Sequence, residues 1–284
     1  MIYLKSFQIP NEERELAAID DRRIYNTSYP VGVLSPKKID KIIFSPITIF
    51  YGGNGSGKTT LLNIISEKLN ASRKNVIEKG TIFHNYVRIC REEMSFEEPD
   101  EVKYISSDDV FDYLLDIRAI NASINRRKNT LTKEFLDKKF NKHEFSIQDH
   151  EDLKDTYDAK HKTMSSFIRE RLTNNNIIEQ SNGESALMFW EQDITENGIY
   201  LLDEPENSLS AENQLKLKKF IEDSARFYNC QFVISTHSPF LLKLEEATIY
   251  DLDSVPVKTK KWNELDNVKL YYNFFKENKK EFEE

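Results

Sequence analysis

The sequence Gly52-Gly53-Asn54-Gly55-Ser56-Gly57-Lys58-Thr59 fills the pattern G-x-x-x-x-G-K-[ST] and lies between two contrasting segments. The segment before it, 42–51, is rich in Ile and Phe, which predicts a strand. After it, apolar residues recur at helical spacing over 58–69. A glycine loop between a strand and a helix can bind phosphate, because its backbone N–H groups converge and the helix N-terminus adds about half a positive charge.

This pattern assigns particular roles to the residues of the loop. We expect the Lys58 ammonium to reach the β- and γ-phosphates of a nucleotide and the Thr59 hydroxyl to ligate Mg²⁺. The alternative is a glycine-rich turn that happens to precede Lys-Thr, but eight positions and both flanking segments agree with phosphate binding. The predicted nucleotide-binding residues of this segment are Gly52, Gly53, Asn54, Gly55, Ser56, Gly57, Lys58, Thr59 and Thr60.

A second apolar run, at 198–202, ends in two acidic residues, Asp203 and Glu204. The carboxyl ends of parallel strands lie at the ligand edge of an α/β sheet, so both carboxylates are expected near the phosphates. We predict that Asp203 holds Mg²⁺ and that Glu204 orients and deprotonates the attacking water, their side chains pointing to opposite faces of the strand. A surface turn would be the usual interpretation of Asp-Glu without the glycine loop.

A third apolar run, at 231–235, leads into Ser235-Thr236-His237-Ser238. A histidine at the end of a strand beside a triphosphate can hydrogen-bond the γ-phosphate. We therefore predict that His237 acts with Lys58 and Glu204 in catalysis, although an isolated histidine is more often structural.

The three segments together resemble the ABC-type ATPases, and their amino-acid sequences are similar to those of the non-transporter branch. That branch includes the heads of chromosome-maintenance (SMC) and recombination-repair ATPases and the ATPase modules of overcoming-lysogenization-defect (OLD) and other anti-phage systems. The resemblance rests on Asp203-Glu204-Pro205-Glu206-Asn207-Ser208-Leu209-Ser210 and on Ser235 to Phe240, whereas transporter subunits more often read Asp-Glu-Pro-Thr. It implies ATP and Mg²⁺ as cofactors and ATP hydrolysis as the activity.

The resemblance also implies a signature loop, and Ser181-Asn182-Gly183-Glu184-Ser185 precedes Asp203 in the expected order. Asn182 and Glu184 depart from the usual Leu-Ser-Gly-Gly-Gln. Without the resemblance, this segment would be interpreted as a helix-capping turn. The family implies a head-to-tail dimer around two ATP molecules, in which Ser181 and Gly183 of one subunit face Lys58 and Glu204 of the other.

Two family features have no clear counterpart. No glutamine occupies the Q-loop position. The segment 106–109, Ser-Ser-Asp-Asp, stands there, and an oxygen-bearing side chain in it could approach Mg²⁺ or water; the alternative, which we favour, is an N-cap for the following helix. The residue that stacks on adenine is unassigned, with Tyr25 and Tyr29 as candidates.

Strand and helix patterns alternate at both ends of the chain, which predicts an α/β fold. We expect an ABC-ATPase-type P-loop sheet with flanking helices, formed discontinuously by residues 1–105 and 173–284. Residues 106–172 are highly charged with apolar positions at helical spacing, and we expect them to form an inserted helical lobe. Further strands are predicted at 2–9, 81–91, 101–105 and 247–252, and further helices at 211–227, near 239–245 and over the last twenty residues.

The composition places limits on function and location. The chain has 284 residues and a net charge of −8, which argues against a uniformly basic nucleic-acid coat. Its two cysteines, Cys90 and Cys230, lack metal-site spacing and indicate neither a disulfide framework nor a zinc site. No apolar run suggests a signal peptide or a membrane span, so we expect a cytoplasmic protein.

One stretch is strongly basic. Residues 126–142 hold seven lysines and arginines against Glu134 and Asp137, with Leu131, Phe135 and Phe140 expected to anchor one helix face. Nucleic acid is one interpretation of the basic face; a solvated helix or a surface for an acidic protein is the other. The residues proposed to contact nucleic acid are Arg126, Arg127, Lys128, Lys138 and Lys139.

Two functions remain open at this point. The first is an ATP-dependent homodimer that couples nucleotide state to nucleic acid or to a partner effector, in DNA maintenance or antiviral defence. The second is the nucleotide-binding subunit of an ABC membrane transporter.

Overall fold

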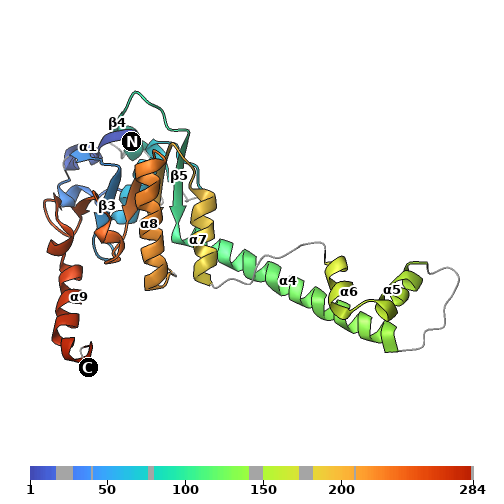
Figure 1. Ribbon diagram of the computed structural model, residues 1–284. Helices are drawn as coiled ribbons and strands as arrows, with labels where there is room; N and C mark the ends of the chain where they lie inside the picture. Colours follow the sequence, from blue (N-terminus) through green and yellow to red (C-terminus); the bar gives the residue numbers. More distant parts are fainter. Residues whose placement is uncertain are drawn as a thin grey trace. The chain divides into compact units, whose positions relative to one another are not determined.

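The computed structural model describes residues 1–16, 28–39, 41–75, 80–140, 150–172, 182–207 and 209–282. The chain divides into two compact units. Met1–Phe111 and Gly183–Glu284 form the first unit, and Asp112–Asn182 form the second (Figure 1).

The first unit is built on a six-stranded sheet in which five neighbouring strands are parallel and the last, β9, runs antiparallel to β8. Every residue of the central strands β6, β7 and β3 is buried, as expected of a parallel sheet covered on both faces. The strand order is β5 (Glu101–Ser106), β6 (Gly198–Asp203), β7 (Gln231–Ser235), β3 (Ile47–Tyr51), β8 (Thr248–Asp251) and β9 (Lys258–Thr259).

A smaller antiparallel sheet has the order β2 (Lys41–Ile43), β1 (Leu4–Gln8) and β4 (Arg91–Met94). The buried side chain of Gln231 joins the two sheets, because its Oε1 accepts from the N–H groups of Tyr3 and Leu4 and its Nε2 donates to the Leu4 carbonyl. These bonds satisfy backbone groups that would otherwise be buried without partners.

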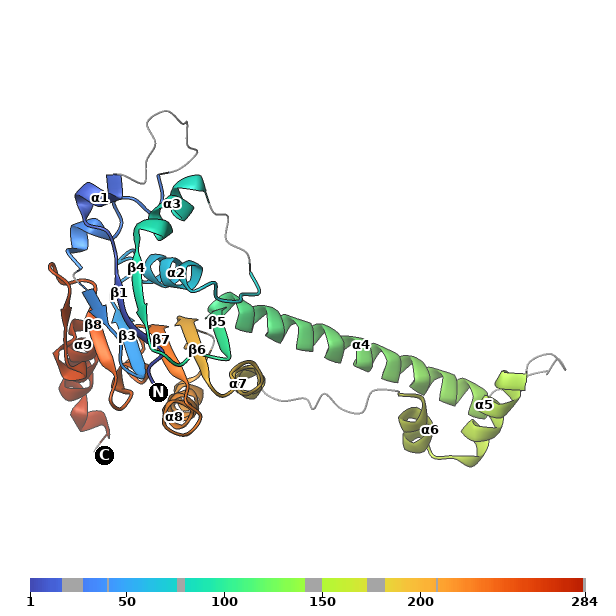
Figure 2. The same ribbon diagram turned by 90° about the horizontal axis from the view of Figure 1, so that it is seen from above.

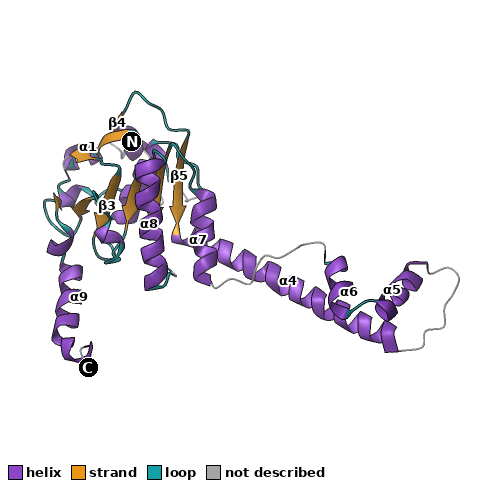
Figure 3. Ribbon diagram, in the orientation of Figure 1, coloured by secondary structure: helices purple, strands orange, loops and turns teal. Residues whose placement is uncertain are grey.

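Helices cover both faces of the large sheet, with α2 on one side and α7 and α8 on the other (Figure 2). Figure 3 shows the helices in purple and the strands in orange. The predicted α/β fold is thereby confirmed. The helices of this unit are α1 (Glu12–Leu16), α2 (Lys58–Lys68), α3 (Thr81–Ile89), α7 (Asn182–Asp193), α8 (Ala211–Phe227) and α9 (Asp266–Glu277), with the 3-10 turns Ser35–Lys37, Leu241–Lys243, Trp262–Glu264 and Lys279–Phe282.

The predicted strand at 81–91 is wrong. Thr81–Ile89 forms helix α3, and a strand begins only at Arg91. Ile82, Phe83, Tyr86 and Val87 are all buried, and they recur one turn apart, so the pattern has a helical period that the β-branched and aromatic composition concealed.

Other boundaries also differ from the predictions. The predicted strand 42–51 is two strands, β2 and β3, which belong to different sheets and are separated around Pro46. The short helix near 239–245 is a single 3-10 turn. The predictions at 198–202, 211–227, 231–235 and 247–252 agree with the structure to within one residue at each end.

The second unit is helical, as the charge and spacing of this stretch predict. It contains most of α4 (Ser107–Phe140), together with α5 (His150–His161) and α6 (Met164–Arg171). Leu131 and Phe135 pack with Ala159 and Phe167 in a small core. Phe140 lies outside this core and is largely exposed, which corrects its predicted anchoring role.

Two further observations concern the whole described chain. Cys90 and Cys230 are free thiols, both buried. In the described parts of the chain, no helix is both long enough and apolar enough to cross a membrane.

Candidate nucleotide-binding site

The glycine loop lies where its sequence pattern predicts, between the end of β3 at Tyr51 and the start of α2 at Lys58. Gly57 has a φ of 98°, and a Cβ there would lie 3.0 Å from Leu34 Cδ2, so this position needs glycine. In the described structure no side chain caps α2, which leaves the N–H groups of its first turn for a ligand. A pocket of about 390 Å³ adjoins them, lined by Val33, Asn54, Gly55, Ser56, Gly57, Lys58, Thr59, Thr60 and Glu204.

The ammonium of Lys58 lies across its own loop. Its Nζ donates to the carbonyls of Gly52 at 2.7 Å and Gly53 at 3.1 Å, and it is 3.7 Å from Glu204 Oε1. The side chain is only 5% exposed and lines the pocket, so solvent screens its charge little. An ammonium held at a helix N-terminus is suited to a polyphosphate.

Asp203, the last residue of β6, accepts hydrogen bonds from side chains of three other elements, α2, β7 and β5. Its Oδ1 accepts from Thr59 Oγ1 at 3.2 Å and from the Ser235 hydroxyl, and its Oδ2 accepts from the Tyr104 hydroxyl at 3.0 Å. The two residues predicted to hold Mg²⁺, Thr59 and Asp203, are therefore in direct contact. A hydroxyl and a carboxylate oxygen side by side are the donors that Mg²⁺ prefers, so these residues fit the metal.

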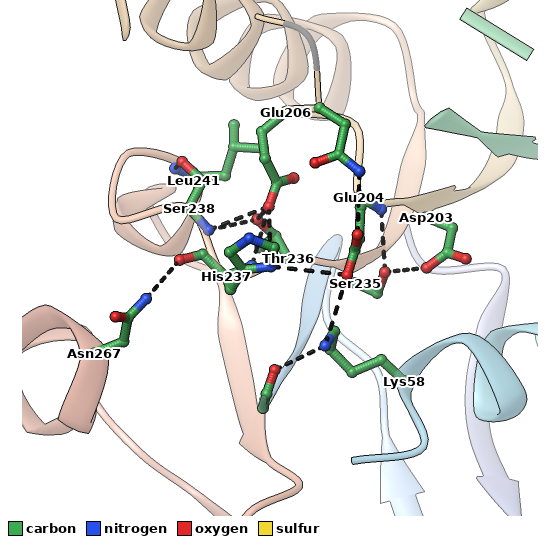
Figure 4. Close-up of polar contacts among 12 residues, drawn as sticks. Lys58, Asp203, Glu204, Glu206, Ser235, Thr236, His237, Ser238, Leu241 and Asn267 are labelled. Carbon is green, nitrogen blue, oxygen red and sulfur yellow. Dashed lines mark hydrogen bonds and ion pairs between the residues drawn. The ribbon is translucent and has the colours of Figure 1, made fainter. Parts of the chain in front are cut away.

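Glu204 follows directly after β6, and its side chain points toward the Lys58 ammonium (Figure 4). Its N–H donates to the carbonyl and the hydroxyl of Ser235, and its Oε2 accepts from Asn207 Nδ2 at 3.1 Å. Its φ is 49°, a left-handed conformation that is uncommon outside glycine and recurs at functional sites. This backbone turn, and not strand alternation as predicted, separates Glu204 from Asp203.

His237 lies beside Glu204, just after the end of β7. Its Nδ1 is 3.7 Å from Glu204 Oε1 and 3.8 Å from Glu206 Oε1, and the ring is about half exposed. The imidazole thus lies between two carboxylates at the ligand edge of the sheet (Figure 4).

Glu206 is the buried support of this histidine. Its Oε1 accepts from Thr236 Oγ1 at 2.6 Å, from the His237 N–H at 3.1 Å and from the Ser238 N–H at 3.2 Å. Its Oε2 is buried and has no hydrogen-bond partner among the described residues. Burial raises the pKa of Glu206, while the bonds from Thr236 and His237 oppose this by favouring the carboxylate.

We expect Glu206→Ala to lower the free energy of unfolding by about 2–4 kcal/mol, because it removes the acceptor of three hydrogen bonds in the Thr236–Ser238 segment. Urea unfolding of the nucleotide-free chain measures this. Glu206→Gln retains an acceptor oxygen and should recover at least half of the loss. The matched control is Glu212→Ala, since Glu212 lies exposed on α8 with only a surface ion pair to Lys216. An unchanged urea midpoint in Glu206→Ala would contradict this role.

The remaining predicted residues are distributed as follows. Gly183 lies in the first turn of α7, whereas Ser181 and Tyr25 lie outside the described residues. Tyr29 stacks on Phe83 at a centroid distance of 5.8 Å, and Val33 lines the nucleotide pocket instead. At the Q-loop position, the Ser106 N–H and hydroxyl both donate to Asp109 Oδ2, so this segment caps α4.

The sequence predictions gave no role to several residues that the structure places at the site. Ser235 and Tyr104 hold Asp203, and Asp253 accepts from the Gly53 N–H at 2.9 Å. Strand register explains the first two, because Ser235 and Ser106 lie opposite Asp203 on its two neighbouring strands and Tyr104 is two residues before Ser106. Ser235 could have been found as the polar end of a predicted core strand; Asp253 has no local signal.

A family model described as ABC transporter matches residues 44–207, which include the glycine loop, Asp203 and Glu204. Solved structures similar to this chain include an SMC head domain from Thermotoga maritima, with 15% identity, a TM-score of 0.42 and coverage of 92% of this chain and 99% of that one. Another is a dimeric post-hydrolysis ATP-binding cassette bound to ADP and Pi, with 16% identity, a TM-score of 0.36 and coverage of 92% and 99%. A third is an inward-facing putative metal-chelate type ABC transporter, with 16% identity, a TM-score of 0.37 and coverage of 80% and 76%. The search of curated proteins gave no match.

Proposed function

Since the chain belongs to the ABC transporter family, whose model covers more than half of it, we propose that it binds ATP with Mg²⁺ and hydrolyses the terminal phosphate. One observation carries this proposal. Around the uncapped N-terminus of α2, the structure places the Lys58 ammonium 3.7 Å from the Glu204 carboxylate and the Thr59 hydroxyl 3.2 Å from the Asp203 carboxylate.

Thr59 and Asp203 would hold Mg²⁺, and the ion would neutralise phosphate charge when bound. The chain's own residues then have separate tasks. Lys58 and the N–H groups of the first turn of α2 bind the phosphates, and Tyr104 and Ser235 orient Asp203. Glu204 Oε1 accepts a proton from the attacking water, and His237 lies beside it to contact the γ-phosphate.

The proposal includes a head-to-tail homodimer in which Ser181 and Gly183 of one subunit complete the site of the other. The lining of the pocket supports a dimer, because the phosphate donors among its described residues come from the glycine loop and the first turn of α2. Phosphate charge developing in the transition state needs further donors, which a second subunit would supply.

Protein concentration tests this arrangement. Phosphate release per chain, measured with ATP and Mg²⁺, should rise with protein concentration through a dimerisation range and then level off. Without Mg²⁺, hydrolysis should be lost. A turnover number that is independent of concentration down to nanomolar chain would contradict the shared site, while leaving ATP binding untouched.

Coupling to nucleic acid or to an effector protein, in DNA maintenance or antiviral defence, is the finer part of the proposal. It is supported by the basic stretch of α4, where Arg126, Arg127 and Lys128 are all exposed and Leu131 and Phe135 are buried beside them. The buried residues fix α4 to the small core of the second unit, and the exposed cationic side chains of α4 remain available to phosphates.

Replacing Arg126, Arg127 and Lys128 together by Gln should weaken binding of a labelled DNA duplex and reduce the slope of log affinity against log salt by up to about 3, since each lost phosphate contact contributes about 0.9. Fluorescence anisotropy over a salt series measures both quantities. The matched control replaces the exposed Lys258 and Lys261. An unaltered slope in the triple variant would contradict DNA binding by this helix and would favour an ordinary solvated helix.

A second candidate is the energising subunit of a membrane transporter, which the description of the matching family favours. The two candidates predict different partners. Co-purification from native membranes with an integral membrane protein would support the transporter role, whereas capture with a nuclease, a toxin or nucleic acid would support the first.

A further inference from the structure

Helix α9 leaves the first unit with an apolar face that the rest of the described chain does not cover. Leu265, just before the helix, and Val268, in its first turn, are buried. Every residue from Lys269 to Glu277 is exposed. Figure 1 shows this helix extending away from the sheet, in red.

The exposed residues are sorted by chemistry around the helix. At about 100° per residue, the apolar side chains from Val268 to Phe275 fall within one arc of about 200°. Lys269, Asn273, Lys276 and Glu277 occupy the remaining arc. Phe282, from the turn that follows, packs edge-on against Phe275 at 6.1 Å and extends the apolar surface. We call this surface the α9 face; its exposed members are Leu270, Tyr271, Tyr272, Phe274, Phe275 and Phe282.

Such a helix is not stable when its apolar face meets water. An isolated helix of about 12 residues is marginal, and most helical stability in proteins comes from burying the apolar face. Leu270 is 68% exposed and Phe274 59% exposed, so the described residues of one chain do not supply that contribution. The α9 face therefore requires a partner surface.

We propose that this partner is the α9 face of a second copy of the chain, in a two-fold pair that forms without nucleotide. The face exposes on the order of 700 Å² of apolar surface, which approaches the about 800 Å² per partner of a standard interface. No charged side chain lies within the arc, so the matching surface must itself be apolar, and the chain offers such a surface in α9 itself. A two-fold pair lets one patch bury its own copy.

The charge of α9 favours a second copy of the chain over a lipid surface as the partner of the α9 face. An amphipathic helix that lies on a membrane is usually drawn there by net positive charge. Here the polar arc carries Lys269 and Lys276 against Asp266 and Glu277, and the whole chain carries a net charge of −8. An anionic membrane would repel the chain.

The base of α9 is joined to the candidate site. Asn267 Nδ2 donates to the His237 carbonyl at 3.1 Å, and the Asn267 N–H donates to the Tyr51 hydroxyl at 3.1 Å. Tyr51 is the residue before the glycine loop. An α9 pair would thus be anchored next to both nucleotide sites, although the pairing itself does not depend on the proposed ATP-dependent contact.

Sedimentation of the full nucleotide-free chain tests the pairing. We expect a dimer at micromolar concentration, a monomer for the double variant Phe274→Glu, Phe275→Glu, and a dimer for the control Phe227→Glu, which alters an exposed phenylalanine at the end of α8. A wild-type monomer, a dimer that persists in the double variant, or flotation of a monomer with phosphatidylcholine–phosphatidylserine vesicles would overturn the proposal.

Cross-linking gives a second measurement that needs no disruptive variant. Cys90 and Cys230 are buried, so a single new surface cysteine can be oxidised selectively. Tyr271→Cys, at the middle of the apolar arc, should form a disulfide-linked dimer, whereas Asn273→Cys on the polar arc should not. Equal cross-linking of both variants would overturn the pairing. Failure of the ATP-dependent dimer would appear separately, as no added association of a Glu204→Gln chain with ATP.

Discussion

Glu204→Gln is expected to lower the rate of ATP hydrolysis by about 10² to 10⁴ while leaving ATP affinity nearly unchanged. Glutamine has the same shape as glutamate and its amide oxygen can still accept from Asn207 Nδ2, so the loop geometry is retained. The amide cannot take a proton from water, however. The carboxylate that would do so lines the pocket and lies 3.7 Å from both Lys58 Nζ and His237 Nδ1.

The same variant should hold ATP in a closed dimer, because the step that discharges the phosphate is blocked. Phosphate release measures the chemistry, and sedimentation with ATP and Mg²⁺ measures the association. Glu212→Gln, an exposed glutamate on α8, is the matched control and should behave as wild type. Normal hydrolysis by Glu204→Gln would show that another group is the base.

Lys58→Ala should weaken ATP binding by about 10² to 10⁴, the equivalent of two charge-assisted hydrogen bonds of about 1.5–3 kcal/mol each. The structure places this ammonium at the floor of the pocket, where little solvent screens it. Alanine also leaves the carbonyls of Gly52 and Gly53 without their donor, so part of the loss reflects a less ordered loop.

Isothermal titration with a non-hydrolysable ATP analogue measures this affinity, and circular dichroism checks that α2 is retained. Lys68→Ala is a matched control on the same helix, since Lys68 pairs with Glu92 at 3.2 Å at the far end of α2. Unaltered ATP affinity in Lys58→Ala would contradict the proposal that the glycine loop binds the phosphates of ATP.

The interpretation of the candidate site depended on short segments, and the strands and the helix that flank those segments were predicted well. The glycine loop, the acidic end of β6 and the histidine after β7 each consist of neighbouring residues, so their conformation follows from local chemistry. The strand predicted at 81–91 failed for the opposite reason. Its Ile, Phe, Tyr and Val residues suit either a strand or a buried helix, and packing against the core chose the helix that buries Phe83 and Tyr86.

Contacts between distant segments could not be predicted in the same way. Tyr104 and Asp203 are 99 residues apart, and Gly53 and Asp253 are 200 residues apart. They meet because β5 and β6 are neighbours in a defined register, and because the loop after β8 lies beside the loop after β3. Neither strand order nor register is written in a local pattern.

The amino-acid sequence by itself therefore determined the α/β class and predicted a phosphate loop with acidic and histidine partners, because glycine conformation and hydrophobic period act over a few residues. Only the tertiary structure decided that Glu206 is the buried acceptor of the His237 segment, that Tyr104 and Ser235 hold Asp203, and that the apolar face of α9 is exposed. These features depend on which surfaces the folded chain brings together, and burial is a property of the whole packed molecule.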